Sequence, residues 1–198
     1  MSTIISIQGA RGSFNEEAAK ELVSQEAIAN PVLRYSHTTR RVFEDLASGR
    51  ALYGVFALYN SRSLLVEETA AVLGHVPFDI VNSITLPIRH CVLVHPEVSC
   101  DHLTQIVGHP EALRQCRDTL RRTFASVPHR ALSEEDFSDG AAVAAALAAG
   151  DERISPTTAV LGSRAIAAAY DFTICAQDIH DDPSNATTFL LVRRYPSE

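Results

Sequence analysis

The sequence predicts an α/β protein made of two parallel-sheet lobes with a hinged cleft. Short apolar runs alternate with stretches of helical periodicity, and such alternation implies parallel strands with helices on both faces of a sheet. The alternation is interrupted once, by a long apolar segment at residues 84–94 that contains Pro87. Because proline cannot donate to a β-ladder, a strand that leaves one lobe and enters another explains this segment better than one central strand.

A weak similarity between the two halves of the chain places the lobe boundaries. A polar gap separates the runs at residues 78–81 and 89–94, and another separates the runs at residues 172–175 and 188–192. Each pair indicates a strand that ends one lobe and a strand that enters the other. Ligands bind by default where two such lobes meet. We therefore expect one lobe at residues 1–83 plus 186–198 and a second lobe at residues 84–185.

Local signals place the individual elements. Ser13 and Glu16 have the spacing of a capping box, which predicts a helix start, and Pro110 is favoured at the first position of another helix. In that second helix, one apolar face is expected to hold Leu113, Cys116, Leu120 and Phe124. We expect strands at residues 4–7, 32–35, 53–58, 79–81, 84–94, 105–107, 130–132, 158–161, 172–176 and 189–192. We expect helices at residues 13–23, 42–49, 67–73, 110–124, 140–149 and 164–170.

Composition excludes several classes of function. The chain has 198 residues, a net charge of −7 and no block of basic residues, so neither nucleic acid nor an anionic membrane is expected as a partner. No apolar run approaches the roughly 20 residues of a membrane span, and the first residues do not resemble a signal peptide. The four cysteines form no C-x-x-C pair. We therefore expect no metal site, no disulfide framework and a cytoplasmic location.

The segment at residues 182–192 is the local candidate for a functional loop. A polar turn runs into Thr187 and Thr188, then into an apolar run that indicates a buried strand. Such a turn can satisfy its own backbone groups or carry chemistry, and the pattern alone leaves both open. The glycine turn at residues 9–13 has neither a dinucleotide fingerprint nor a P-loop, so a small carboxylate is expected as ligand rather than a nucleotide.

Several short motifs follow one another along the chain. They are Gly12-Ser13-Phe14 with Glu17-Ala18-Ala19, Asn60-Ser61, His90-Cys91, His109-Pro110-Glu111 with Gln115-Cys116, Leu161-Gly162-Ser163, and Asn185-Ala186-Thr187-Thr188-Phe189. Together and in this order, they resemble the catalytic domain of prephenate dehydratase over essentially the whole chain. The resemblance implies lobes of the periplasmic-binding-protein type II kind, a homodimer, and conversion of prephenate to phenylpyruvate with loss of carbon dioxide and water. It implies no cofactor, because aromatisation drives the reaction.

The resemblance also implies roles for particular residues. Thr187 is expected to donate the proton with which the ring hydroxyl leaves as water, and Asn60 and Gln115 are expected in the same catalytic site. Local alternatives stay open, because Ser13 can be a helix N-cap and Gln115 can lie on a solvated helix face. His90 is expected in a strand interior. The residues expected to bind substrate are Ser13, Ser61, Arg62, Arg89, Asn185, Thr188 and Phe189.

The chain departs from the family pattern at its most charged position. The arginine of the family motif is Thr188 here, and threonine cannot reproduce the bidentate binding of a carboxylate by a guanidinium. We expect Arg62, Arg89 or Arg11 to take its place. At two positions where the family pattern has glutamate, this chain has Tyr59 and Ser83. At a position where the pattern has threonine, it has Asp139.

These departures leave two alternatives to a prephenate dehydratase. One is a non-aromatising prephenate decarboxylase, which loses carbon dioxide but keeps the ring hydroxyl. The other is a pair of lobes that binds a small carboxylate without turnover. No residue follows Glu198 in the sequence, so no regulatory domain is expected.

Overall fold

The computed structural model describes residues 2–133 and 137–195, which fall into two compact units. Unit 1 comprises Met1–Gly9, Asn15–Pro87 and Ala186–Glu198, and unit 2 comprises Ala10–Phe14 and Ile88–Asn185. The first boundary therefore stands after Pro87 instead of after Ser83. Ser83 lies inside a continuous strand, β5 (Phe78–Pro87), and this is why the expected boundary was displaced.

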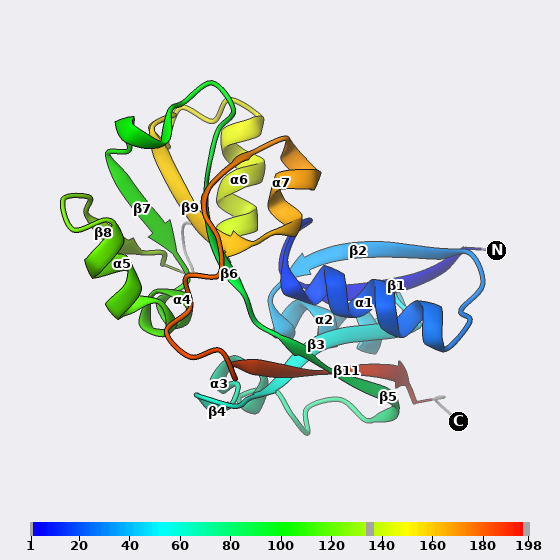
Figure 1. The fold of residues 1–198 in the computed structure, drawn as a ribbon. Helices are drawn as coiled ribbons and strands as arrows, with labels where there is room; N and C mark the ends of the chain where they lie inside the picture. Colours follow the sequence, from blue (N-terminus) through cyan, green and yellow to red (C-terminus); the bar gives the residue numbers. More distant parts are fainter. Residues whose placement is uncertain (1, 134–136, 196–198) are drawn as a thin grey trace. The chain divides into compact units, whose positions relative to one another are not determined.

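Unit 1 contains a mixed six-stranded sheet (Figure 1). Its strands run in the order β2 (Pro31–His37), β1 (Thr3–Gln8), β3 (Tyr53–Asn60), β11 (Ala186–Arg194) and β5, with β4 (Leu64–Leu65) paired to β3. β1 is parallel to both β2 and β3, as the β-α-β pattern predicts. β11 is antiparallel to both β3 and β5. The helices of this part of the chain are α1 (Phe14–Gln25), α2 (Thr39–Ala47) and α3 (Glu67–Ala70).

Helix α2 packs closely on the sheet of unit 1 through one apolar face. Val42 and Leu46 are fully buried on this face, and the ring of Phe43 lies 5.3 Å from that of Phe56 on β3. A Cβ added to Gly54 would stand 2.8 Å from Val42 Cγ1, so glycine is what permits this close approach. A helix was expected at residues 42–49, and α2 overlaps most of this range.

Unit 2 contains a five-stranded mixed sheet (Figure 1). The strand order is β10 (Thr173–Ala176), β6 (His90–Val94), β9 (Thr158–Ser163), β7 (Gln105–Gly108) and β8 (His129–Ala131). β7 is parallel to β8 and β9, whereas β6 is antiparallel to β9 and β10. The helices are η1 (Cys100–His102), α4 (Pro110–Gln115), α5 (Arg117–Thr123), α6 (Gly140–Ala148) and α7 (Ala165–Tyr170).

The long helix expected after Pro110 is broken into α4 and α5 at Cys116, which has φ −116° and ψ 8°. The break frees backbone N–H groups at the start of α5, and the Asp181 carboxylate accepts from two of them, those of Asp118 and Thr119. The predicted apolar face survives, because Cys116 and Leu120 are buried in one core cluster. Helix α3 is also shorter than expected and ends at Ala70.

Two of the four cysteines form a disulfide bond, so the expectation of none was wrong. Cys100 in η1 and Cys175 in β10 are bonded, with their Cα atoms 5.5 Å apart, although 75 residues separate them in sequence. The sequence spacing gave no signal because only the folding of unit 2 brings them together. Cys91 and Cys116 are free and buried.

None of the helices in the described ranges combines the length and apolar character that crossing a membrane requires.

Candidate active site

A hydrogen bond between Asn60 and Thr187 is the centre of the candidate site in unit 1. Asn60 is the last residue of β3, and Thr187 is its register partner on β11. Asn60 Nδ2 donates to Thr187 Oγ1 over 2.8 Å. Both side chains are nearly inaccessible, with exposed fractions of 4% and 7%. The strand pairing thus fixes the two groups expected to share a catalytic site next to each other.

The loop after β3 determines which way the Asn60 amide faces. Asn60 Oδ1 accepts from the backbone N–H groups of Arg62 (2.9 Å) and Ser63 (3.2 Å), so Nδ2 must face Thr187. Thr187 Oγ1 is therefore an acceptor in this bond, and its own hydrogen is left to donate elsewhere. Within residues 2–133 and 137–195, no group accepts that hydrogen. The arrangement presents a hydroxyl donor.

Ser61 forms two hydrogen bonds with Ala186, the first residue of β11 and the neighbour of Thr187. Its backbone N–H donates to Ala186 O (2.9 Å), and its Oγ accepts from Ala186 N (3.0 Å). Ser61 was expected to bind substrate. The structure gives its hydroxyl a second role, which is to position the residue before Thr187.

The next two residues of β11 do not join this pair. Successive side chains on a strand point to opposite faces, and the Thr188 hydroxyl bonds instead to that of Thr85 on β5, over 2.8 Å. Phe189 is only 1% exposed, so its ring is part of the core of unit 1. The expectation that Phe189 binds substrate therefore needs correction, because an apolar side chain buried this deeply offers a ligand no surface.

A second cluster, in unit 2, is built around Gln115 at the end of α4. Gln115 Oε1 accepts from Asn185 Nδ2 (2.7 Å), and Gln115 Nε2 donates to Glu111 Oε1 (2.7 Å). His90 Nε2 lies 3.1 Å from the same Oε1. Because that oxygen is an acceptor, His90 must carry its proton on Nε2. Gln115 and Asn185, both expected in the site, are thus brought together with His90.

His90 is the residue of this cluster whose part the sequence did not reveal. Burial lowers its pKa to about 4, outweighing the hydrogen bond to Gln115, which raises it, so the imidazole is neutral at pH 7. Its Nδ1 is buried and has no hydrogen-bond partner in the described part of the chain. Phe14 contacts the ring edge-on, with 5.4 Å between centroids. His90 was expected in a strand interior, but it is the first residue of β6 and thus lies at the start of the strand.

The loop that carries Ser13 belongs to unit 2 and is held there at two points. Ser163 Oγ, whose residue pairs with His90 in the β6–β9 register, donates to Gly12 O, and Ala10 N donates to Asp139 Oδ2. Gly12 has φ +87°, and a Cβ there would lie 3.2 Å from the Ile166 backbone, so this turn requires glycine. Ser13 itself is 8% exposed.

The three arginines expected to replace the family's motif arginine lie on the surfaces of their own units. Arg62 is exposed in unit 1, and Arg11 and Arg89 are exposed in unit 2. The guanidinium of Arg89 lies 3.8 Å from Asp178, in an ion pair that is half exposed. A pair of this kind contributes little to stability and leaves the guanidinium available to another anion.

The free cysteines do not add a nucleophile to either cluster. Burial raises the pKa of the thiols of both Cys91 and Cys116. No group of three or more histidine, cysteine or acidic side chains suited to a metal ion occurs among the described residues.

The fold and the two clusters define an α/β protein with a buried hydroxyl donor held by an amide. Residues 5–197 match the family model named prephenate dehydratase, and the chain therefore belongs to the prephenate dehydratase family.

Relatives of this chain carry dehydratase names. Arogenate dehydratase 1 of Petunia hybrida is 33% identical over 193 residues, which are 97% of this chain and 42% of the relative. The bifunctional chorismate mutase/prephenate dehydratase of Pseudomonas aeruginosa is 27% identical over 184 residues, or 93% of this chain and 47% of the relative. The chain thus spans less than half the length of these curated relatives.

A solved structure supports the fold assignment. The prephenate dehydratase from Arthrobacter aurescens, crystallised in complex with L-Phe, superposes with a TM-score of 0.79 and 22% identity. The match covers 98% of this chain and 61% of that chain. At this level of identity the likeness shows a shared fold.

Proposed function

We propose that this chain catalyses the decarboxylative dehydration of prephenate to phenylpyruvate. The observation that carries the proposal is the orientation of the Asn60–Thr187 pair, in which Thr187 accepts from the amide and keeps its own hydrogen to donate. Membership of the prephenate dehydratase family makes prephenate the first substrate to test.

The chemistry requires a proton donor at one oxygen. As the bond between the ring and its carboxylate breaks, its electron pair moves into the ring and expels the ring hydroxyl, which takes up a proton and leaves as water. Thr187 supplies that proton. Negative charge then develops on Thr187 Oγ1, and the hydrogen bond from Asn60 Nδ2 strengthens as it does, so a weakly acidic hydroxyl becomes a better acid during the step. Solvent restores the proton afterwards.

The carboxylates of the substrate need cationic or amide partners. We assign this role to Arg62 or Arg89, with Gln115, Asn185 and Ser13 as polar partners. The hydrogen bond from Asn185 to Gln115 supports a common role for these two amides. The position of Thr188 on the opposite strand face supports a binding cation elsewhere than at residue 188.

Arogenate is the second substrate to test, because the Petunia relative is named for it. It has an amino group where prephenate has a keto group, and the same elimination would yield phenylalanine. The ring chemistry at Thr187 is identical for both substrates, so the Asn60–Thr187 pair does not discriminate between them.

Non-aromatising decarboxylation is the alternative that the sequence departures favour. Tyr59, Ser83 and Thr188 replace charged residues of the family pattern. In that reaction the ring hydroxyl stays, and the proton goes to a ring carbon instead of to the leaving oxygen.

We further propose a cytoplasmic homodimer that requires no cofactor. Aromatisation supplies the driving force for the reaction, and the net charge of −7 argues against nucleic acid as a partner. Light scattering of the purified chain tests the dimer. A mass twice that of one chain is expected, and a monomer would contradict it.

Product analysis tests the proposed reaction. Purified protein is incubated separately with prephenate and arogenate, and products are identified by mass spectrometry, with the Thr187→Ala variant as control. Phenylpyruvate from prephenate supports the proposal. If arogenate is converted to phenylalanine and prephenate is not converted, the substrate is arogenate. A product that retains the ring hydroxyl supports the decarboxylase. If prephenate binds but is not converted, the chain is a carboxylate-binding protein without this activity.

A further inference from the structure

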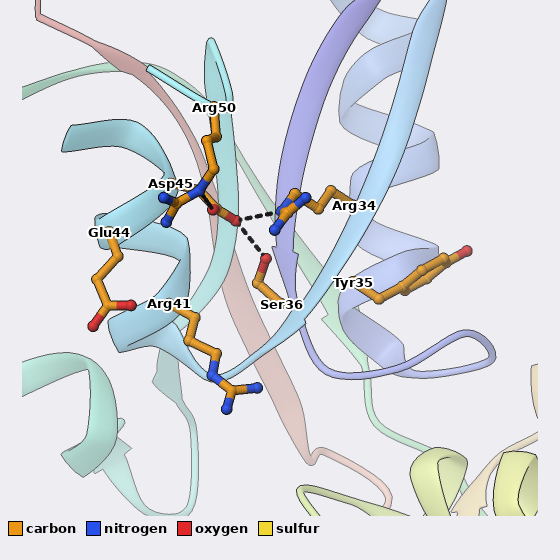
Figure 2. A pocket seen from close by; sticks show the side chains of 7 residues that line it. All are labelled: Arg34, Tyr35, Ser36, Arg41, Glu44, Asp45 and Arg50. Carbon is orange, nitrogen blue, oxygen red and sulfur yellow. Dashed lines mark hydrogen bonds and ion pairs between the residues drawn. The ribbon is translucent and has the colours of Figure 1, made fainter. Parts of the chain in front are cut away.

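A polar pocket in unit 1 lies apart from the candidate active site. It has a volume of about 270 Å³ and is lined by residues of β2, α2 and the segment after α2, among them Arg34, Arg41 and Arg50 (Figure 2). β2 is the edge strand of the sheet, and β1 and β3 separate it from β11, which carries Thr187. The pocket is therefore a separate feature of the same unit.

A buried carboxylate organises this pocket. Asp45, which is 2% exposed, accepts at Oδ2 from Ser6 Oγ (2.8 Å), Ser36 Oγ (2.7 Å) and Arg34 Nε (2.9 Å). Its Oδ1 accepts from Arg50 Nε (2.7 Å). Burial opposes ionisation of Asp45, but these hydrogen bonds outweigh it and lower its pKa to about 2. Asp45 is thus a fixed anion that holds two guanidiniums in place.

The two arginines bound to Asp45 use only part of their N–H donors in the hydrogen bonds to that carboxylate. Arg34 and Arg50 each reach the carboxylate through Nε, and their terminal Nη groups have no partner among the residues that the structure describes. Figure 2 shows both side chains directed at Asp45, whereas Arg41 extends away from it. The guanidinium of Arg41 contacts no anion in the described ranges. The pocket therefore holds several unused, oriented N–H donors.

The charge of the lining also favours an anion. Three arginines stand against two carboxylates, Asp45 and Glu44, which leaves a local excess of one positive charge in a protein whose net charge is −7. Asp45 already accepts four hydrogen bonds, and none of them comes from the remaining guanidinium donors. The planar donor fork of arginine matches the oxygens of a phosphate group, and a polar, charged lining suits a compact and strongly hydrated ligand.

We propose that this pocket is a binding site for a small phosphate-bearing anion. Arg34 and Arg50, pre-oriented by Asp45, present their Nη groups to the phosphate oxygens, and Arg41 supplies the third cation. Because the two arginines are already held by their Nε atoms, little side-chain freedom is lost on binding. The site does not depend on the proposed dehydratase reaction.

Calorimetric titration with inorganic phosphate, at constant ionic strength, tests this site. The Arg41→Gln variant removes one cation without disturbing Asp45, and the Arg40→Gln variant is a matched control, since Arg40 is also exposed on α2 but does not line the pocket. We expect saturable binding that is about tenfold weaker in Arg41→Gln and unchanged in Arg40→Gln. Unfolding midpoints without phosphate verify that both variants fold.

Two results would overturn the proposal. The first is absence of saturable phosphate binding by the wild type, or equal weakening in both variants. The second is binding of the dicarboxylate malonate as tight as that of phosphate, which would remove the phosphate assignment. The Thr187→Ala variant separates this site from the catalytic one, because it is expected to bind phosphate like the wild type even if no dehydratase activity is found.

Discussion

The two side-chain clusters, one in each unit, differ in what their hydrogen bonds leave available. In unit 1 the Asn60 amide is held by backbone donors on one side and donates to Thr187 on the other, and the hydroxyl hydrogen of Thr187 has no acceptor within the described part of the chain. In unit 2 the Gln115 oxygen accepts from both His90 and Asn185, and its nitrogen donates to Glu111. The first cluster ends in an available donor, whereas in the second the Gln115 amide is bonded at both its oxygen and its nitrogen and His90 Nδ1 is left without a partner among the described residues.

This difference separates a reacting group from positioning groups. A proton donor needs one hydrogen-bonding direction open toward the substrate, whereas a positioning group is more effective when all its directions are occupied. We therefore expect changes in the unit 1 cluster to lower the rate of the chemical step, and changes in the unit 2 cluster to act on stability and on substrate affinity.

The largest effect is expected at Thr187. The Thr187→Ala variant should lose about a thousandfold in kcat, because it removes the proposed acid, whereas Thr187→Ser should stay within about tenfold of the wild type. Steady-state kinetics with prephenate measure both. Thr85→Val is the control, since it deletes a neighbouring hydroxyl of the same sheet that bonds to Thr188 instead. Equal activity of the alanine and serine variants would remove Thr187 from its role.

The next largest effect is expected at Asn60. The Asn60→Asp variant keeps the oxygen that accepts from the loop but loses the amide donor, so the Thr187 hydroxyl would turn and donate to the new carboxylate. We expect kcat to fall about a hundredfold with little change in KM. Since protonation of that carboxylate would restore a donor, the relative activity of the variant should rise as the pH is lowered. A loss confined to KM would contradict the proposed role.

A pH effect on stability is expected from His90 in the unit 2 cluster. Its pKa of about 4 in the folded chain lies below the ordinary 6.5, so the unfolded chain binds more protons between these values. The contribution of neutral His90 to the free energy of unfolding is fully present above pH 6.5. It is lost as the pH drops toward 4, and the loss is on the order of 2 kcal/mol at pH 5.

Urea unfolding at pH 7 and pH 5 measures this contribution. The His90→Gln variant should lose part of the pH dependence, and His75→Gln, at an exposed position, should keep it. An unchanged dependence in His90→Gln would show that other groups cause the loss of stability at low pH.

The sequence predicts best what is decided locally. Periodicity and capping signals place most helices and strands within a few residues, because the apolar face of α2 or the proline at the start of α4 acts over one or two turns. The β-α-β pattern also predicts the parallel pairing of β1 with β2 and β3. The antiparallel direction of β11 and β6 was missed, since it depends on how distant segments return to a sheet.

Contacts between residues far apart in sequence could not be predicted from local patterns, because they depend on how distant segments come together in the fold. Cys100 and Cys175 are 75 residues apart, and no spacing rule links His90 to Gln115. The resemblance to the family did name Asn60 and Thr187, which the structure places in contact. It also named Phe189, whose ring is buried in the core together with the next three residues of β11 and is not available to a ligand.

The smallest effects are expected at the arginines that we propose as carboxylate partners. Arg62 and Arg89 are exposed, and the ion pair of Arg89 with Asp178 is long, so replacing either arginine by alanine should cost little stability. Each replacement should raise KM for prephenate about tenfold and change kcat less, because a guanidinium binds the carboxylate in the ground state and in the transition state alike. Arg117→Ala, at an exposed arginine beside Asp118, is the control. If Arg62→Ala and Arg89→Ala both left KM unchanged, neither cation would replace the family arginine, and Arg11 would be the next residue to test.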